Sequence, residues 1–403
     1  DEVVSSDITR PTDAFRVEYN NKVKKIHILL ALLLVFSFCT EEPEAAEQPP
    51  TTVSEVPVTA TIVKDTTTTT SSSTISTTTS ALPNSCSSCI YIDIGDLLSK
   101  SSEVPRVAWD DSQRILNKNI STNINENVEL IIREGPSTIF FFNENEQSIQ
   151  KGIDFWKNFK LPQKYYAFFY SFSDLDWAIN EINGYGFWGD NAKSPCVLDE
   201  AICTGANSGL HHESPYHGVG KFGINSADSW DRYRYGPIHI HEFTHSAVAA
   251  QWIGVAGNPQ ENANQATPCW LNEGIAHFAG LSVGIDTYSE YVEVRKGQVT
   301  GRHIQPPFND YSTSAILNYY NESVPRECLG KPDYVLGYSV GYLTVEALSA
   351  MAGSDSAMHM YTEMASGKDF EAAFGIIYDI AWSEAKPVLA QYISSVIGEF
   401  FNS

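Results

Sequence analysis

The stretch that decides the fold is His241-Glu242-Phe243-Thr244-His245. Residues four apart in an α-helix lie on one face, with their Cβ atoms about 5–6 Å apart. Two imidazoles at this spacing can both reach one Zn²⁺ ion, at about 2.0–2.1 Å. Glu242, next to the first histidine, can then face a metal-bound water instead of the metal. The spacing predicts a catalytic zinc site with Glu242 as its general base.

The residues around this stretch predict a buried helix, whereas a bare match could be a polar helix with two solvated histidines. Gly236-Pro237 supplies a helix start, because proline is tolerated in the first turn. Gly254 ends the run. Buried imidazoles need partners, and a metal ion supplies one. Apolar residues cover most of the predicted helix: Ile238, Ile240, Phe243, Ala247, Val248, Ala250 and Trp252.

A second motif follows at residues 268–278, with the core Trp270-Leu271-Asn272-Glu273-Gly274. Val248 and Gln251 stand where a metzincin has a glycine and a third histidine, which excludes that class. The two motifs instead resemble those of the gluzincins, the peptidase MA-like superfamily that includes thermolysin and the aminopeptidase-N-like enzymes. The resemblance implies that Glu273 is the third zinc ligand, although the residue alone could be an ordinary acid near a helix N-terminus.

The segment Tyr334–Gly353 resembles the gluzincin helix whose tyrosine hydrogen-bonds the oxyanion of the tetrahedral intermediate. Tyr338 occupies the matching position of the Y-x-x-G motif, and Tyr334 is a second candidate. A positioned phenol can stabilise developing negative charge, but most of the 20 tyrosines are expected to be packing residues. His277, four residues after Glu273, is expected either beside the ligands or partly exposed.

The resemblance covers about residues 236–400, and a further motif, at residues 367–375, matches G-x-x-F-x-x-A-F. Residues 84–235 match only as a general pattern. The strand motif with which aminopeptidases recognise a free substrate amine is absent before His241, so aminopeptidase specificity is not implied. The resemblance implies an α+β, zincin-like catalytic domain that hydrolyses peptide bonds.

The N-terminal part predicts export. Residues 22–39 join a basic start to an apolar run too short to span a bilayer as a mature helix, which is typical of a secretory signal. Cys39 resembles the lipidated cysteine of a bacterial lipoprotein; cleavage without lipidation and a retained signal anchor are the alternatives. We assign residues 1–38 to upstream residues and signal, and 39–83, rich in Thr, Ser, Pro and Glu, to a disordered tether.

Residues 84–403 are enough for one large domain of two lobes, with the zinc site between them. The first lobe, 84–235, is predicted to be mixed α/β, and the second, 236–403, mainly helical. We predict His217–Asn225 as a sheet edge beside the cleft, where an extended peptide could add as a strand. The other predicted elements of the first lobe are strands at Ser137–Phe142 and Tyr165–Phe172 and helices at Glu144–Phe159 and Asp174–Ile182.

The cysteines also favour an extracytoplasmic protein. Of the seven cysteines, six are left if Cys39 is lipidated, and an even number is typical of disulfides in exported chains. Nearest pairing gives Cys86–Cys89, Cys196–Cys203 and Cys269–Cys328, which is one of several possible connectivities. Cys86 and Cys89 form a C-x-x-C pair that would also suit redox or metal chemistry.

The formal charge of −23 is spread along the chain. It disfavours nucleic acids and anionic membrane surfaces as partners. We therefore expect a monomer at the cell surface or secreted, whose membrane contact is a lipid anchor on Cys39. His211-His212-Glu213 is interpreted as a surface loop rather than a second metal site, because adjacent side chains point in different directions.

These features together predict a zinc metallopeptidase in which His241, His245 and Glu273 hold Zn²⁺, Glu242 is the base and Tyr338 stabilises the oxyanion. Two alternatives stay open. One is a zinc hydrolase of other amides or esters, and the other is a surface-anchored binding or structural protein with an idle zincin fold. The intact Glu242 argues against an idle site.

Overall fold

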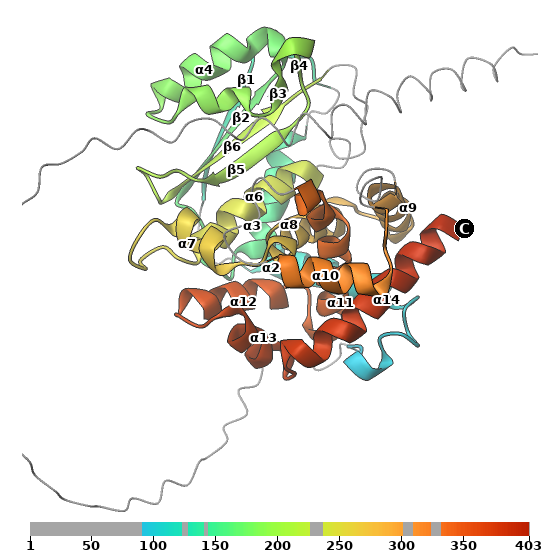
Figure 1. Ribbon diagram of the computed structural model, residues 1–403. Coiled ribbons are helices and arrows are strands. Elements are labelled where there is room, and N and C mark those ends of the chain that lie inside the picture. The colour runs from blue at the N-terminus through green and yellow to red at the C-terminus, as the bar shows by residue number, and fades with distance from the viewer. Residues whose placement is uncertain are drawn as a thin grey trace, which may run out of the picture.

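The computed structural model describes residues 91–122, 128–140, 144–225, 237–300, 309–323 and 332–402. A sheet with one covering helix forms the upper part of the molecule in Figure 1, and a helical layer forms the lower part. The predicted α+β class is confirmed. The predicted signal, Cys39, the tether and the Cys86–Cys89 pair lie outside the described residues.

Four strands form the sheet in the order β1-β2-β6-β5. β1 (Glu129–Glu134), β2 (Lys164–Tyr170) and β6 (His217–Gly223) run parallel, and β5 (Ala206–Leu210) pairs antiparallel with β6. β2 is buried at six of its seven positions, because a central strand of a parallel sheet is covered on both faces. α4 (Leu175–Gly184) covers one face, and α6 (Pro237–Ala250) lies against the other (Figure 1).

Several sequence predictions for this part are confirmed. β2 lies within the strand predicted at Tyr165–Phe172, apart from its first residue. The two predicted helices are present as α3 (Asn145–Trp156) and α4, each shifted by one to three residues. Short apolar runs and helical periodicity therefore locate these elements, while their ends depend on local capping.

The strand predicted at Ser137–Phe142 is wrong for its described part, because residues 137–140 form the end of a turn and a segment without regular structure. The Asp174 carboxylate accepts hydrogen bonds from the Ser137 backbone N–H and the Thr138 hydroxyl. These bonds hold the chain in a turn after β1, since a side-chain acceptor competes with the sheet for the same donors.

The predicted sheet edge at His217–Asn225 is also wrong in its position. These residues do form a strand, β6, but it lies inside the sheet between β2 and β5. The edge strand next to β6 is β5, with the sequence Ala-Asn-Ser-Gly-Leu, and β1 is the edge on the other side. That sequence is poor in β-branched and aromatic residues, so its propensity gives little sign of a strand.

The helical layer also draws on the first part of the chain. α2 (Val104–Ser121) packs on α8 and α11, and the Ile92 N–H donates to the Ala350 carbonyl at the end of α11. After Pro237 the described chain is helical, as predicted. Its remaining elements are α7 (Pro259–Ala266), α8 (Cys269–Gly284), α9 (Tyr288–Gln298), α10 (Thr313–Glu322), η6 (Pro332–Tyr338), α11 (Val340–Ala352), α12 (Ser356–Ala365), α13 (Phe370–Tyr378) and α14 (Trp382–Asn402).

Shorter elements complete the first part of the chain. β3 (Cys196–Val197) and β4 (Ile202–Cys203) form a small hairpin closed by the predicted Cys196–Cys203 disulfide. Cys269 is also disulfide-bonded, and its predicted partner Cys328 lies outside the described residues. The short helical turns are η1 (Ile94–Asp96), η2 (Phe172–Asp174), η3 (Gly189–Lys193) and η4 (Leu198–Glu200).

α11 is the core helix of the helical layer. The segment Tyr334–Ala352 is the one described segment apolar and long enough to cross a membrane, but 72% of its window is buried inside the protein. Glu346 in this helix is fully buried and pairs with Arg295 of α9, with Nε–Oε1 at 2.8 Å. Tyr291 donates a further hydrogen bond to Oε1 at 2.5 Å. The charges are therefore tolerated in the core because every oxygen has a donor.

We predict that Arg295→Met destabilises the protein by about 3–5 kcal/mol, because it leaves the Glu346 carboxylate buried without its counter-charge. The midpoint of urea unfolding, followed by tryptophan fluorescence, measures the change. Lys100→Met is the control, since it removes an exposed pair with Asp96 and should leave the midpoint unchanged. Equal midpoints for the native protein and Arg295→Met would contradict the prediction.

Candidate metal centre

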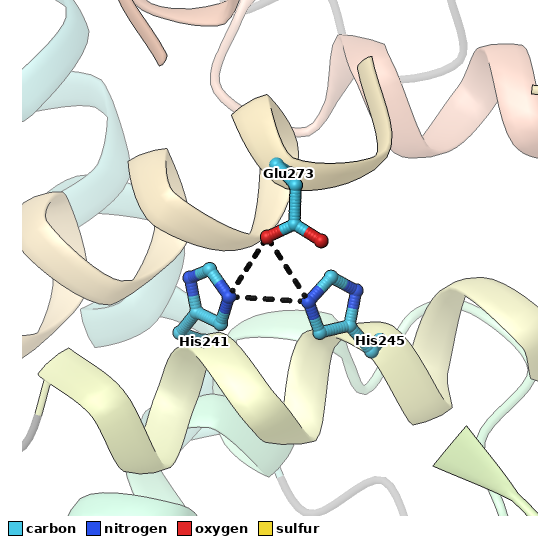
Figure 2. Close-up of side chains that lie close together, drawn as sticks. All are labelled: His241, His245 and Glu273. Carbon is cyan, nitrogen blue, oxygen red and sulfur yellow. Dashed lines mark hydrogen bonds and ion pairs between the residues drawn. The ribbon is translucent and has the colours of Figure 1, made fainter. Parts of the chain in front are cut away.

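α6 places His241 and His245 on one face, one turn apart. The helix begins at Pro237, as the sequence predicts, and most of its residues are buried. The Nε2 atoms of the two imidazoles lie 3.1 Å apart. In Figure 2 both rings point from this helix toward the helix above them. The predicted i, i+4 pair is therefore formed.

α8 brings the third side chain to the same point. Glu273 Oε2 lies 3.3 Å from His241 Nε2 and 3.6 Å from His245 Nε2, and Figure 2 shows the three groups as a triangle. Ligand atoms at tetrahedral corners around a zinc ion would be about 3.4 Å apart, given metal–ligand distances of about 2.0–2.2 Å. The three separations in the protein fit that spacing.

The chemistry of these atoms also fits a metal. Glu273 Oε2 is buried and accepts no hydrogen bond, although it faces two ring nitrogens. A buried carboxylate oxygen without a donor is costly, and a cation held by all three atoms would compensate it. Within the described residues, His241, His245 and Glu273 form the one group that can hold a metal ion.

The His211-His212-Glu213 segment is not part of such a group among the described residues. The prediction of a surface loop is right for His212 and Glu213, which are exposed. It is wrong for His211, which is buried and lies against the rings of Phe187 and Trp188. Two aromatic neighbours bury the imidazole, a contact that sequence position alone does not reveal.

When no metal is bound, the side chains of His245 and Glu273 strongly shift each other's pKa values. Burial, the largest single influence, lowers the pKa of His245, but Glu273, Glu242 and Asn272 together outweigh it and raise this pKa to about 9. Burial likewise works to raise the pKa of Glu273, but His245 and His241 hold it well below its usual value. A proton on the imidazole therefore takes the place of a metal ion as the counter-charge.

Glu242 lies on α6 between the two histidines in sequence but on a different face. It is buried, and burial is the main cause of its raised pKa. Ser246, one turn further along α6, lies within hydrogen-bonding distance of Ser208 in β5, at 3.0 Å. The face of α6 that carries Glu242 and Ser246 is therefore turned toward the sheet, next to its β5 edge.

Two tyrosines of η6 cover the ligands. Tyr338, the residue predicted to bind the oxyanion, stacks on the His241 ring, with centroids 5.7 Å apart. Tyr334 has a role that the sequence does not assign, because its hydroxyl donates to Glu273 Oε1. η6 approaches so closely that a Cβ on Gly337 would lie 2.7 Å from the Cβ of Glu273. Glycine at 337 is therefore needed for this contact.

Two further residues lie close to the histidines. Asn272, next to the ligand Glu273, helps to raise the pKa of His245. His277 lies beside the ligands, which is one of the two positions expected from the sequence. Its ring centroid is 5.7 Å from that of His241. Hydrogen bonds and packing around metal ligands fix ring orientation. The structure thus brings together the predicted site residues, including the second tyrosine candidate Tyr334, and adds Asn272.

Comparison with known proteins adds no relative. No protein-family model, curated protein or solved structure matches the chain. The metal centre therefore stands on its own geometry.

We predict that Tyr334→Phe weakens metal binding by about tenfold to a hundredfold, because the Glu273 carboxylate loses the donor that orients it. Competition with a chromogenic chelator measures the zinc affinity. Tyr185→Phe, which changes an exposed tyrosine far from the ligands in sequence, serves as the control. An unchanged affinity in Tyr334→Phe would show that the hydrogen bond does not orient the ligand.

A second prediction concerns protons. Because the pKa of His245 is raised to about 9 without metal, this imidazole is protonated at pH 7.5 and must lose its proton to bind a metal. Zinc affinity should rise about tenfold per pH unit toward pH 9 and then level off. Calorimetry at pH 7.5 in two buffers of different ionisation enthalpy should detect the released proton. Binding without proton release would contradict the assignment of His245.

Proposed function

We propose that this protein is an extracytoplasmic zinc metallopeptidase. The observation that carries the proposal is the triangle of His241, His245 and Glu273 atoms at zinc-ligand spacing. Glu242, which belongs to the same helix but not to the ligand group, is the second support. Three ligands and a separate buried carboxylate are the parts of a site that activates water.

Zinc, when bound here, would supply Lewis-acid polarisation of the scissile carbonyl and lower the pKa of water. The remaining steps belong to side chains of the protein. Glu242 accepts the proton of the attacking water on its carboxylate and passes it to the leaving amine. Burial favours the protonated form of Glu242, which suits a group that must hold a proton between these two transfers.

Tyr338 is proposed to donate a hydrogen bond to the negative charge that develops on the carbonyl oxygen. Its stacking on His241 places it beside the ligands. Burial is the largest cause of its strongly raised pKa, followed by the negative charges of Glu273 and Glu242. The phenol therefore stays protonated and able to donate at neutral pH.

The substrate is proposed to be a peptide that pairs with the β5 edge. β5 lies next to the Glu242 face of α6 through the contact of Ser208 with Ser246. An extended peptide that adds to this edge would run past the general base. In this proposal β5 replaces His217–Asn225, the segment that the sequence analysis predicted as the peptide-binding edge.

Location and partners are part of the same proposal. The Cys196–Cys203 disulfide supports an oxidising compartment outside the cytoplasm. We also propose that the protein is a monomer whose membrane contact is a lipid anchor on Cys39. The formal charge of −23 disfavours a nucleic-acid partner.

The test compares the native protein with Glu242→Gln in hydrolysis of a quenched peptide library. We expect kcat/KM to fall by about 10²–10⁴-fold, with one zinc per chain retained, because glutamine cannot accept the proton. Glu371→Gln, an exposed acid of α13, is the matched control and should keep full turnover.

Three other outcomes would redirect the assignment. Full turnover by Glu242→Gln would overturn the mechanism. Hydrolysis of small amides or esters without peptide cleavage would identify a different zinc hydrolase. No hydrolysis of any kind despite bound zinc would favour a binding or structural protein with an idle zincin fold.

A further inference from the structure

Along β5, the backbone N–H and C=O groups of successive residues point alternately toward β6 and away from the sheet. At one end of the strand the Gly205 carbonyl accepts from the Gly223 N–H, and at the other the His211 N–H donates to the His217 carbonyl. Bonded and non-bonded pairs alternate in an antiparallel ladder. Every second residue between these ends therefore bonds to β6, and the others direct their backbone groups outward. The outward residues are Ala206, Ser208 and Leu210.

One end of this edge is closed by a side chain of α7. Gln260 Oε1 accepts a hydrogen bond of 2.8 Å from the Leu210 N–H. Gln260 also donates to Asn264 one turn further along the helix. Its amide crosses directly over Gly209, where a Cβ would lie 2.5 Å from Oε1. Gln260 thus occupies the place where the carbonyl of an added strand would bind Leu210.

The other end is closed by the backbone of the β3–β4 hairpin. The Pro195 carbonyl accepts hydrogen bonds of 2.9 Å from both the Thr204 and Gly205 N–H groups. The disulfide between Cys196 and Cys203 joins the residues next to these partners and fixes the hairpin. The edge therefore has a stop before Ala206 as well as one at Leu210.

The two stops leave a short window between them. Their hydrogen bonds go to residues on either side of Ala206 and Ser208, which are half-buried and lie beside α6. A cavity of about 440 Å³ at this edge lies on the other face of the sheet, on the α4 side, with Ile182, Gly209 and Gln260 in its wall, and is separate from the α6 face. Protection of an edge against aggregation would explain the stops, but not a gap placed beside Glu242.

We propose that Gln260 and Pro195 are end stops that limit substrate pairing to Ala206–Ser208, so that the protein recognises a short extended peptide segment. The proposal rests on the proposed peptidase function. Two outward residues pair with two alternate residues of a peptide, which requires a segment of three residues. Backbone recognition should therefore be complete in a short peptide, and further residues should add little affinity.

The experiment measures peptide binding without cleavage. Full-length protein carrying Glu242→Gln is titrated with one peptide sequence lengthened from three to eight residues, by fluorescence anisotropy. The same titration is repeated with Gln260→Ala added, and with Gln260→Glu as the control that keeps an acceptor for the Leu210 N–H. Amide hydrogen exchange at Leu210 shows whether the stop has opened, and exchange at the amides of α7 shows whether that helix is still folded.

With Gln260 in place, we expect affinity to level off at about four residues. With Gln260→Ala, the longest peptides should bind about fivefold more tightly than the shortest, because the outward backbone groups of Leu210 become available for pairing. Gln260→Glu should keep the plateau. Turnover of the same peptides by protein with an intact Glu242 is measured in parallel.

Affinity that keeps rising with length while Gln260 is present would overturn the inference. So would an unchanged plateau in Gln260→Ala despite faster exchange at Leu210, or the absence of peptide binding. A plateau that Gln260→Ala removes, without Glu242-dependent cleavage, would instead overturn the peptidase proposal and leave the end stops confirmed. The two failures are therefore distinguishable.

Discussion

The convergence of one carboxylate and two imidazoles in the contact between α6 and α8 is the constraint on which this structure depends. Three atoms with lone pairs meet within 3.6 Å of one another, where His241 and Glu273 are buried and the His245 side chain is 12% exposed. Such a group is stable only with a cation or a shared proton among its members. The surrounding elements are arranged accordingly: η6 closes over Glu273, and Tyr334 engages the carboxylate oxygen that does not face the histidines.

A chain of packed side chains connects the metal ligands to the buried Arg295–Glu346 ion pair in the core. The His277 ring lies between those of His241 and Tyr342, at 5.7 and 5.4 Å. The Tyr342 hydroxyl in turn donates to the Glu346 carboxylate that Arg295 holds. Packed rings and hydrogen bonds therefore extend from the ligands to α9. A metal site supported in this way is held by rigid elements, which favours a fixed ligand geometry.

The ligand set could be predicted from the sequence because it depends on the spacing of residues within two short motifs. Helical period places His241 and His245 on one face, and the motif around Glu273 gave the third ligand through its resemblance to the gluzincins. The sequence could not place β5, whose residues have weak strand propensity and form a strand because β6 lies beside them. It also mistook Ser137–Phe142 for a strand, since the competing Asp174 carboxylate comes from a distant part of the chain. The contacts of Tyr334 and Gln260 arise only from tertiary packing.

The place where the described chain begins has a consequence for orientation. Ile92 bonds to the end of α11, and in Figure 1 the first described residues lie at the bottom of the molecule, opposite the sheet. A tether that joins the protein at this point leaves from the helical layer. The sheet then lies at the far end of the molecule, and the β5 edge lies between the two ends, beside α6 (Figure 1). Extended segments of neighbouring macromolecules would therefore reach that edge from the side.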